Sequence, residues 1–163
     1  MEGLLSLSKL TRTELHVSVV NLSPIAQEVA KALQEGDPAR TVRFVITPGI
    51  KVMGDPNLLR IVLENLMGNA WKYTAKRPDA VVEFGVASQP EGTKAYFVRD
   101  NGAGFNMAHA DKLFNAFQRL HSEEEFPGSG IGLATAARII RRHGGKIWAE
   151  GFVDKGATFY FAL

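Results

Sequence analysis

Residues 64–74, ENLMGNAWKYT, form the second half of a predicted helix that runs from about residue 55 to residue 74. This helix decides the fold. One side of this helix is a continuous apolar stripe that we expect to be buried: Leu59, Leu63, Leu66, Met67 and Ala70. A neighbouring stripe begins apolar but turns polar partway along the helix, ending in Asn65, Asn69, Lys72 and Tyr73. Around the helix axis, Asn69 lies about 40° from Asn65 on one side and Lys72 about 20° on the other.

This polar stripe combines groups that suit a metal-bound nucleotide. Amide oxygens can ligate a hard cation, and here two asparagines stand beside a lysine and an aromatic ring. A half-exposed helix with a polar end would give the same pattern, so this stretch alone leaves both interpretations open.

The composition predicts one soluble globular domain. The chain has 163 residues, of which 45% are hydrophobic and 22% charged. It has no apolar run of about 18 residues and no signal-peptide pattern at its start, and it has no cysteine, so disulfides and cysteine-ligated zinc are excluded. We expect a cytoplasmic protein. The net charge of +2 is only mildly basic, so no nucleic-acid partner is expected.

The order of predicted elements favours a layered α+β sandwich over a doubly wound sheet. Helices are expected at 24–35, 55–74 and 130–143, with a weaker one around 107–117. Strands are expected at 14–21, 42–46, 51–53, 80–88, 95–100, 146–151 and 157–162. Ser23 and Asp55 each precede a proline and are the expected N-caps of two helices.

A second motif, RDNGAGF at residues 99–105, follows a predicted strand directly. Asp100, at the end of that strand, can accept a hydrogen bond from an exocyclic amine such as that of adenine. Gly102 and Gly104 allow the chain to turn sharply and to approach a ligand closely. Asp-Asn-Gly is also a common turn sequence, and that alternative remains open here.

A third motif, GSGIGL at residues 128–133, precedes the predicted helix 130–143. A glycine-rich backbone at a helix N-terminus presents free amides to phosphate. A dinucleotide-binding fold is an alternative, because Glu150 stands twenty residues after Gly130; Leu133, however, occupies the position of the third fingerprint glycine. No Gly-Lys-Ser/Thr follows, so a P-loop does not fit, and a plain hinge before a helix is the third possibility.

In this order, and with FNAFQRL at residues 114–120 between the last two, the motifs resemble the catalytic and ATP-binding domain of bacterial sensor histidine kinases, in particular the phytochrome-related and PAS-linked kind. The resemblance covers about residues 20–163. It implies a Bergerat-type fold: a two-layer α/β sandwich with a mixed, mostly antiparallel sheet, about three main helices and an ATP lid.

The resemblance also implies a role for each residue of the first two motifs. Asn69 would coordinate Mg²⁺ on the nucleotide phosphates, with Asn65 as a second metal contact. Lys72 would neutralise phosphate charge, and Tyr73 would pack against adenine or ribose. Asp100 would bind the adenine amino group, in a base pocket that includes Gly102, Gly104 and Phe105.

The remaining implied site residues belong to the lid, at about 103–128, and to its ends. Phe114, Phe117 and Arg119 would lie in the lid, with Arg119 at the terminal phosphate; Asn69, Lys72 and Arg119 would be the catalytic residues. The residues that close the lid on the phosphates would be Gly128, Ser129, Gly130, Ile131, Gly132 and Leu133. Thr158 would contribute a hydroxyl to the base pocket.

The implied function is the transfer of the γ-phosphoryl group of Mg-ATP to a histidine in two-component signalling. Residues 1–13 resemble only the tail of the dimerising hairpin that carries this histidine, and 14–163 would be the catalytic domain, so we expect an isolated monomer from a homodimeric parent kinase. A response-regulator receiver would be the downstream partner. The alternatives are a non-catalytic nucleotide-binding module of the same fold and, more remotely, a dinucleotide-dependent oxidoreductase.

Overall fold

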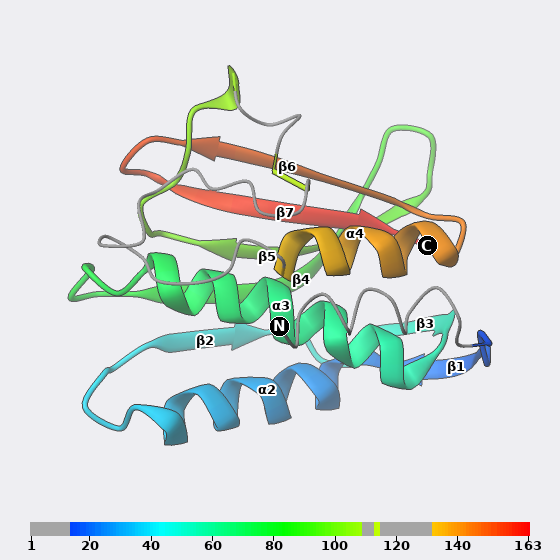
Figure 1. Ribbon diagram of the computed structural model, residues 1–163, viewed down its shortest axis with the longest axis horizontal. Coiled ribbons are helices and arrows are strands. Elements are labelled where there is room, and N and C mark those ends of the chain that lie inside the picture. Colours follow the sequence, from blue (N-terminus) through cyan, green and yellow to red (C-terminus); the bar gives the residue numbers. More distant parts are fainter. Residues whose placement is uncertain (1–13, 109–112, 115–131) are drawn as a thin grey trace.

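Helices cover one face of a five-stranded sheet in the computed structural model, which describes residues 14–108, 113–114 and 132–163 (Figure 1). The described helices are α2 (Leu22–Gly36), α3 (Pro56–Tyr73) and α4 (Gly132–Arg142). Along the sheet, the order is β2 (Arg43–Ile46), β4 (Val81–Ser88), β5 (Lys94–Asp100), β7 (Gly156–Ala162) and β6 (Lys146–Phe152). Among the described strands only β2 and β4 pair in parallel, so the predicted mixed, mostly antiparallel α+β sandwich is confirmed.

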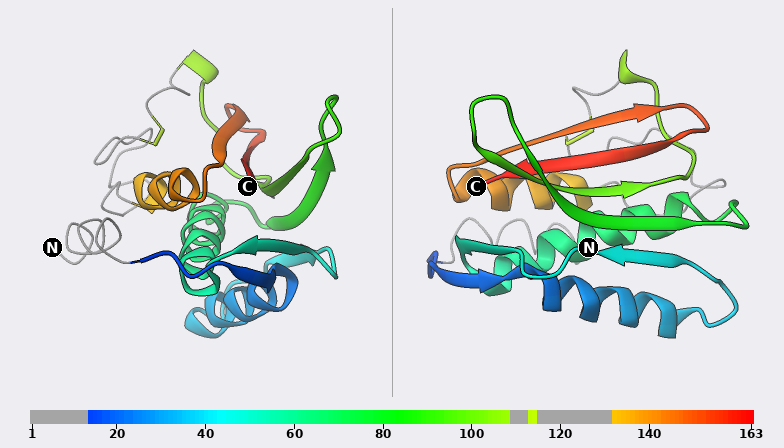
Figure 2. Two further views of the ribbon diagram at one scale, coloured as in Figure 1. Left: turned by 90° about the vertical axis from the view of Figure 1, so that its right-hand side faces the viewer. Right: turned by 180° about the vertical axis from the view of Figure 1, so that it is seen from behind.

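A separate two-stranded sheet stands beside the N-terminal end of α3. It consists of β1 (Ser18–Asn21) and β3 (Lys51–Gly54), which pair antiparallel. Figure 2 shows the helices gathered on one side of the larger sheet, with α3 between α2 and α4. None of the described helices is long and apolar enough to cross a membrane.

The buried face of α3 builds the core, as its periodicity predicted. Leu63, Leu66 and Met67 are fully buried, together with Ile140 of α4 and Phe161 of β7. Each such side chain contributes roughly 1.5–3 kcal/mol relative to an exposed position. The core therefore fixes how α3 is rotated, and with it the direction of the polar stripe.

The helix start signals were right at one helix and wrong at another. Asp55 caps α3, since its carboxylate accepts hydrogen bonds from the backbone N–H groups of Asn57 and Leu58 at 3.0 and 3.2 Å. Ser23 was expected to cap the first helix, but α2 begins at Leu22 with Asn21 as its N-cap. The Ser23 hydroxyl instead donates to the Thr47 carbonyl at 2.6 Å and accepts from the Ile50 N–H at 3.0 Å. A buried serine between two chain segments satisfies their backbone groups, which local sequence does not reveal.

Candidate functional site

The polar stripe of α3 lies at the edge of the core. Asn65, Asn69, Lys72 and Tyr73 are all half-buried, whereas the neighbouring Ala70 is 2% exposed. The Lys72 ammonium lies 5.1 Å from the centroid of the Tyr73 ring. The structure thus brings the four predicted residues onto one half-buried strip, where a ligand can reach them.

Asp100 is a buried carboxyl at the end of β5, on the side of the sheet that faces the helices. It is 5% exposed and pairs with Ala157 of β7. Burial raises the pKa of Asp100 to about 6, although hydrogen bonds from the N–H groups of Gly102 and Ala157 partly offset the effect of burial. The Gly102 N–H donates to Asp100 Oδ1 at 2.8 Å, so the turn that the Asp-Asn-Gly sequence favours is present here.

The loop after Asp100 packs tightly against the last turn of α3. The Ala103 N–H donates to the Tyr73 carbonyl at 3.0 Å, and a Cβ atom on Gly102 would collide with that carbonyl. Gly104 has φ +67°, and a Cβ there would collide with the Phe152 carbonyl. The predicted sharp turn is therefore present, but the space beside both glycines is filled by protein backbone rather than left open for a base.

The end of the third motif meets the middle of the first. A Cβ atom on Gly132, at the start of α4, would lie only 3.1 Å from Asn65 Oδ1, so the close approach of α4 to this amide depends on the glycine. Leu133 is half-buried and packs against the core. The structure thus brings together Asn65 and Gly132, which are far apart in the sequence.

Three further predicted residues lie on β7 or contact it. Phe105 is buried, with its ring centroid 6.3 Å from that of Phe159, and Phe114 contacts the same ring edge-on at 6.3 Å. Thr158 pairs with Arg99, on the face of the sheet opposite to the helices, and its hydroxyl accepts from Arg99 Nε at 3.3 Å. Thr158 and Asp100 therefore point to opposite faces, and the structure does not bring this hydroxyl to the predicted base pocket.

Six predicted site residues lie outside the described residues: Phe117, Arg119, Gly128, Ser129, Gly130 and Ile131. Most of the expected lid, and of the weaker helix expected at 107–117, falls there too.

Two residues that support the site were not identified from the sequence. Asn101 joins the start of β4 to the end of β5, since its Oδ1 accepts from the Val81 N–H and its Nδ2 donates to the Asp79 carbonyl, both at 2.9 Å. The other is Arg40, whose guanidinium donates to the Trp71 carbonyl at 2.6 Å. Asn101 could have been suspected from its place beside Asp100, but no local spacing points to Arg40.

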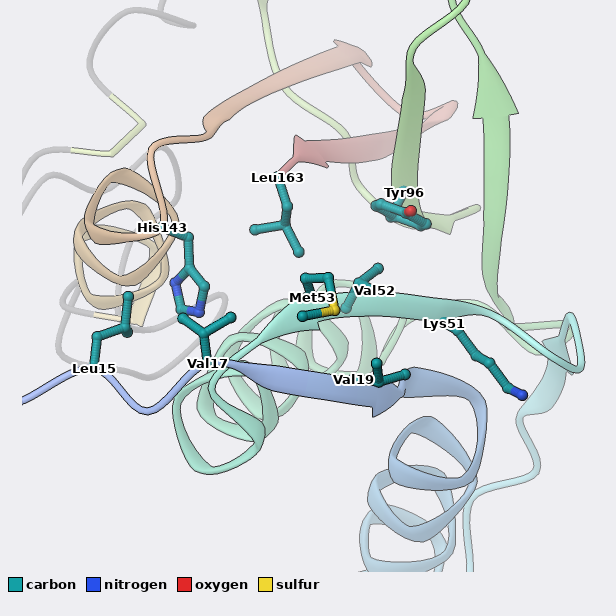
Figure 3. Close-up of a pocket in the computed structure, with 9 residues that line it drawn as sticks. All are labelled: Leu15, Val17, Val19, Lys51, Val52, Met53, Tyr96, His143 and Leu163. Atoms are coloured by element: carbon teal, nitrogen blue, oxygen red, sulfur yellow. The ribbon is translucent and has the colours of Figure 1, made fainter.

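A hollow of about 580 Å³ lies at the other end of the molecule (Figure 3). Apolar side chains dominate its lining, among them Val19 and Met53 of the small sheet and Val17 just before β1, and Leu163 lies over it after β7. Asp100 pairs with the first residues of β7, whereas Leu163 follows its last residue. None of the predicted site residues that the structure describes lines this hollow.

The part of the chain that the structure describes holds no cluster of three or more His, Asp or Glu side chains that could bind a metal by themselves. The amide oxygens that could ligate a metal on the polar stripe are those of Asn65 and Asn69, and both amides are neutral. Two neutral ligands fit Mg²⁺ that is already bound to phosphates, because Mg²⁺ usually keeps only one or two protein ligands there.

Comparison with known proteins decides the family. Residues 54–163 match the sequence profile described as "Histidine kinase-, DNA gyrase B-, and HSP90-like ATPase". The chain belongs to this ATPase family. Family membership and the mostly antiparallel sheet make the dinucleotide-dependent oxidoreductase alternative wrong, since that fold needs a parallel doubly wound sheet.

The relatives of this ATPase domain include cyanobacterial phytochromes and sensory kinases. It is 34% identical to "Cyanobacterial phytochrome B" of Nostoc sp. strain PCC 7120, over 100% of this chain and 22% of the relative. It is 31% identical to "Adaptive-response sensory kinase SasA" of Synechococcus sp. strain JA-3-3Ab, over 93% of this chain and 41% of the kinase. The chain thus spans about a fifth of the length of the phytochromes that it matches.

Solved structures agree on the fold. Full-length ShkA in complex with AMPPNP superposes with a TM-score of 0.79 at 24% identity, over 98% of this chain and 34% of ShkA. The mycobacterial sensor histidine kinase MprB gives a TM-score of 0.74 at 22% identity, over 90% of this chain and 97% of MprB. The predicted Bergerat-type fold is therefore confirmed.

Proposed function

We propose that this ATPase-family domain binds Mg-ATP along the polar stripe of α3. In the full-length protein it would transfer the γ-phosphoryl group to a histidine. The observation that carries the proposal is the convergence of three distant motifs on one helix: Gly132 lies against Asn65, Ala103 is bonded to Tyr73, and Asp100 is buried beside that bond. Each motif alone has an ordinary structural explanation, but their meeting along α3 does not follow from turns or hinges.

Each residue has a chemical task in this proposal. Asn69 and Asn65 would hold Mg²⁺ that arrives with the nucleotide, and the ion would neutralise charge on the phosphates. Lys72 would add a positive charge at the phosphates, and Asp100 would accept a hydrogen bond from the adenine amine. Arg119 would complete the charge neutralisation that phosphoryl transfer chiefly requires.

Asn65 also bears on which reaction is favoured. It stands four residues before Asn69, at a position where topoisomerases, whose nucleotide-binding fold the Bergerat-type resemblance also covers, would have a glutamate to activate water. An amide cannot act as a general base, so we expect slow hydrolysis and favour transfer to a protein side chain. The names of the relatives, which include a sensory kinase and a "Methanogenesis regulatory histidine kinase" of Methanothrix harundinacea, support this choice.

The proposal extends to the larger protein. Residues 1–13 would be the tail of the phosphoacceptor hairpin, and 14–163 the catalytic domain with its lid at about 103–128. The histidine would lie on the same hairpin, outside this chain, and would pass the phosphoryl group to a receiver domain. Dimerisation would come from the hairpin, so this chain alone would be monomeric.

Calorimetric titration with ADP tests the proposal, with and without Mg²⁺ and with NADH as the control ligand. Binding of ADP that Mg²⁺ strengthens, with no signal from NADH, is the expected result. Phosphorylation of a hairpin supplied in trans then tests the transfer. Mg²⁺-dependent ADP binding without any transfer would instead identify a non-catalytic module, and absence of ADP binding would refute the proposed site.

A further inference from the structure

The last turn of α3 has an unusual supply of hydrogen-bond donors. The last four carbonyl groups of an α-helix lack partners within the helix; in α3 these belong to Ala70, Trp71, Lys72 and Tyr73. Adjacent residues satisfy two of them: the Thr74 hydroxyl donates to the Ala70 carbonyl at 2.8 Å, and the Ala75 N–H donates to the Lys72 carbonyl at 3.2 Å. The Trp71 carbonyl lies 3.0 Å from the same Thr74 hydroxyl and accepts a further hydrogen bond from a distant segment, and the Tyr73 carbonyl is also met by a distant segment.

Arg40, in the connection between α2 and β2, holds the first of these carbonyls. Its Nη1 donates to the Trp71 carbonyl at 2.6 Å and its Nη2 to the Thr74 hydroxyl at 3.1 Å. The guanidinium also lies 4.2 Å from the centroid of the Trp71 ring, whose other neighbour is the parallel ring of Phe44 at 6.1 Å. A planar guanidinium can make two directed hydrogen bonds and stack on a ring at once, which an ammonium cannot do.

Arg40 is itself fixed in place. The Gln34 side chain, on α2, donates to the Arg40 carbonyl at 2.5 Å. The Arg40 side chain therefore connects α2 to the end of α3, an arrangement that we call the Arg40 clamp. Its two hydrogen bonds have good geometry and involve a charged donor, which makes them stronger than neutral ones.

The second distant donor is the Ala103 N–H, in the loop that follows Asp100. The carbonyls of Trp71 and Tyr73 lie on either side of Lys72 in the sequence. Arg40 and the Asp100 loop therefore both form hydrogen bonds to the turn that contains Lys72. We propose that Arg40 is a positioning residue for the nucleotide site, which orients Lys72 and Tyr73 and keeps the Asp100 loop bonded to the end of α3. This inference rests on the proposed function, because it assumes that the nucleotide binds here.

Arg40→Gln and Arg40→Lys test the inference in the whole chain. Glutamine removes the positive charge. Lysine keeps the charge but cannot make the two directed hydrogen bonds and stack on the Trp71 ring at once. We expect Mg-ADP affinity to fall about tenfold in Arg40→Gln, with a smaller loss in Arg40→Lys. Hydrogen exchange of the Ala103 amide should accelerate by a similar factor, while the amides of Val82 and Val98 in the centre of the sheet keep their rates.

Arg60→Gln, on α3, is the matched control. Arg60 pairs with Glu28 of α2 at 2.5 Å on the exposed surface, so its loss also removes a link between α2 and α3. This variant should keep both the affinity and the Ala103 exchange rate of the unmodified protein.

The two proposals fail in different ways. If the unmodified protein does not bind Mg-ADP, the proposed function is wrong and the role of Arg40 falls with it. If the unmodified protein binds and both Arg40 variants bind equally well, only the positioning role is wrong. Faster exchange spread evenly over Val82, Val98 and Ala103 would likewise overturn it, because Arg40 would then support global stability alone.

Discussion

Both ends of α3 form hydrogen bonds with distant segments of the chain, but the polar side chains at the two ends have different surroundings. At the first turn, Asp55 accepts hydrogen bonds from the N–H groups of Asn57, Leu58 and His16, the last at 3.1 Å. Its own N–H donates to Nε2 of His143 at 3.0 Å. This end lies beside the apolar hollow that His143 helps to line (Figure 3).

At the last turn, about 27 Å away along an 18-residue helix, the backbone is equally well satisfied. Arg40 and Ala103 supply the donors from outside the helix. The carboxyl groups differ, however. Two backbone N–H groups donate to Asp100 and burial raises its pKa to about 6, whereas three donate to Asp55 and its pKa is lowered. Lys72 and Tyr73, near Asp100, are half-buried.

The difference separates two uses of the same helix. At the first turn, the protein's own groups surround the carboxylate, so its contribution is to folding. At the last turn, the binding role proposed for Asp100 and the polar stripe would explain why a titratable group is buried there. Changes at the last turn should therefore alter binding, and changes at the first turn should alter stability.

The largest expected effect comes from removing the proposed metal ligand. Asn69→Ala should weaken Mg-ADP binding by about a hundredfold, the upper range for loss of groups that support a metal site, and should abolish the strengthening by Mg²⁺. Calorimetry measures the affinities, and circular dichroism checks that the fold is intact. Asn57→Ala, an exposed asparagine on the first turn of the same helix, is the control and should bind normally. Unchanged Mg²⁺ dependence in Asn69→Ala would remove Asn69 from the metal site.

Next in size is the effect of pH at Asp100. The folded-state pKa, about 6, lies above the ordinary value of 3.8, so folding favours the protonated carboxyl. The stability that this provides is complete below about pH 4 and is lost as pH rises through 6, a change on the order of 2 kcal/mol. Urea unfolding from pH 4 to 7, with Asp100→Asn as the reference that cannot titrate, measures it.

Adenine affinity should change in the opposite direction over the same pH range. The ionised carboxyl is the better acceptor for the adenine amine, so ADP binding should weaken as pH falls through 6. In Asp100→Asn, ADP affinity should be weaker and lose this pH dependence. Equal affinity of the unmodified protein for ATP and GTP would contradict the role proposed for Asp100.

Where much of the candidate site lies was predictable because its residues are on one helix. Periodicity determined which side of α3 is buried, and so put Asn65, Asn69 and Lys72 on one strip before any tertiary contact was known. Asp100 was identified for a similar reason, because a strand followed by glycines ends where a loop begins. These are local properties of the chain, which sequence patterns report well.

What could not be predicted depends on registers and contacts between distant segments. Thr158 was expected near Asp100, but in the antiparallel pairing it is opposite Arg99, and a shift of one residue reverses the face. Likewise, whether a ligand or the protein backbone fills the space beside Gly102 depends on where α3 ends. The Arg40 clamp joins residues that are 31 positions apart, so no local sequence motif predicts it.

The smallest effect concerns the first turn of α3. Asp55→Ala should lower the free energy of unfolding by about 1–2 kcal/mol, because three backbone N–H groups lose their acceptor, whereas Asp55→Asn should retain most of the stability. Burial opposes ionisation of Asp55, but the hydrogen bonds from His16, Leu58 and Asn57 outweigh it and lower its pKa below 3.8. Its contribution is therefore present above about pH 4 and lost as pH falls through the folded-state pKa, a range distinct from that of Asp100.

Urea unfolding at pH 3 to 7 measures this loss, and Mg-ADP titration of the same variant decides the comparison. Affinity within about twofold of the unmodified protein is expected, since the cap is some 27 Å from the last turn. A tenfold loss of affinity in Asp55→Ala, with the fold retained, would mean that loss of the N-cap changes the structure at the other end of α3. The stability of the first turn and the binding at the last turn would then be one property of a single rigid helix rather than two.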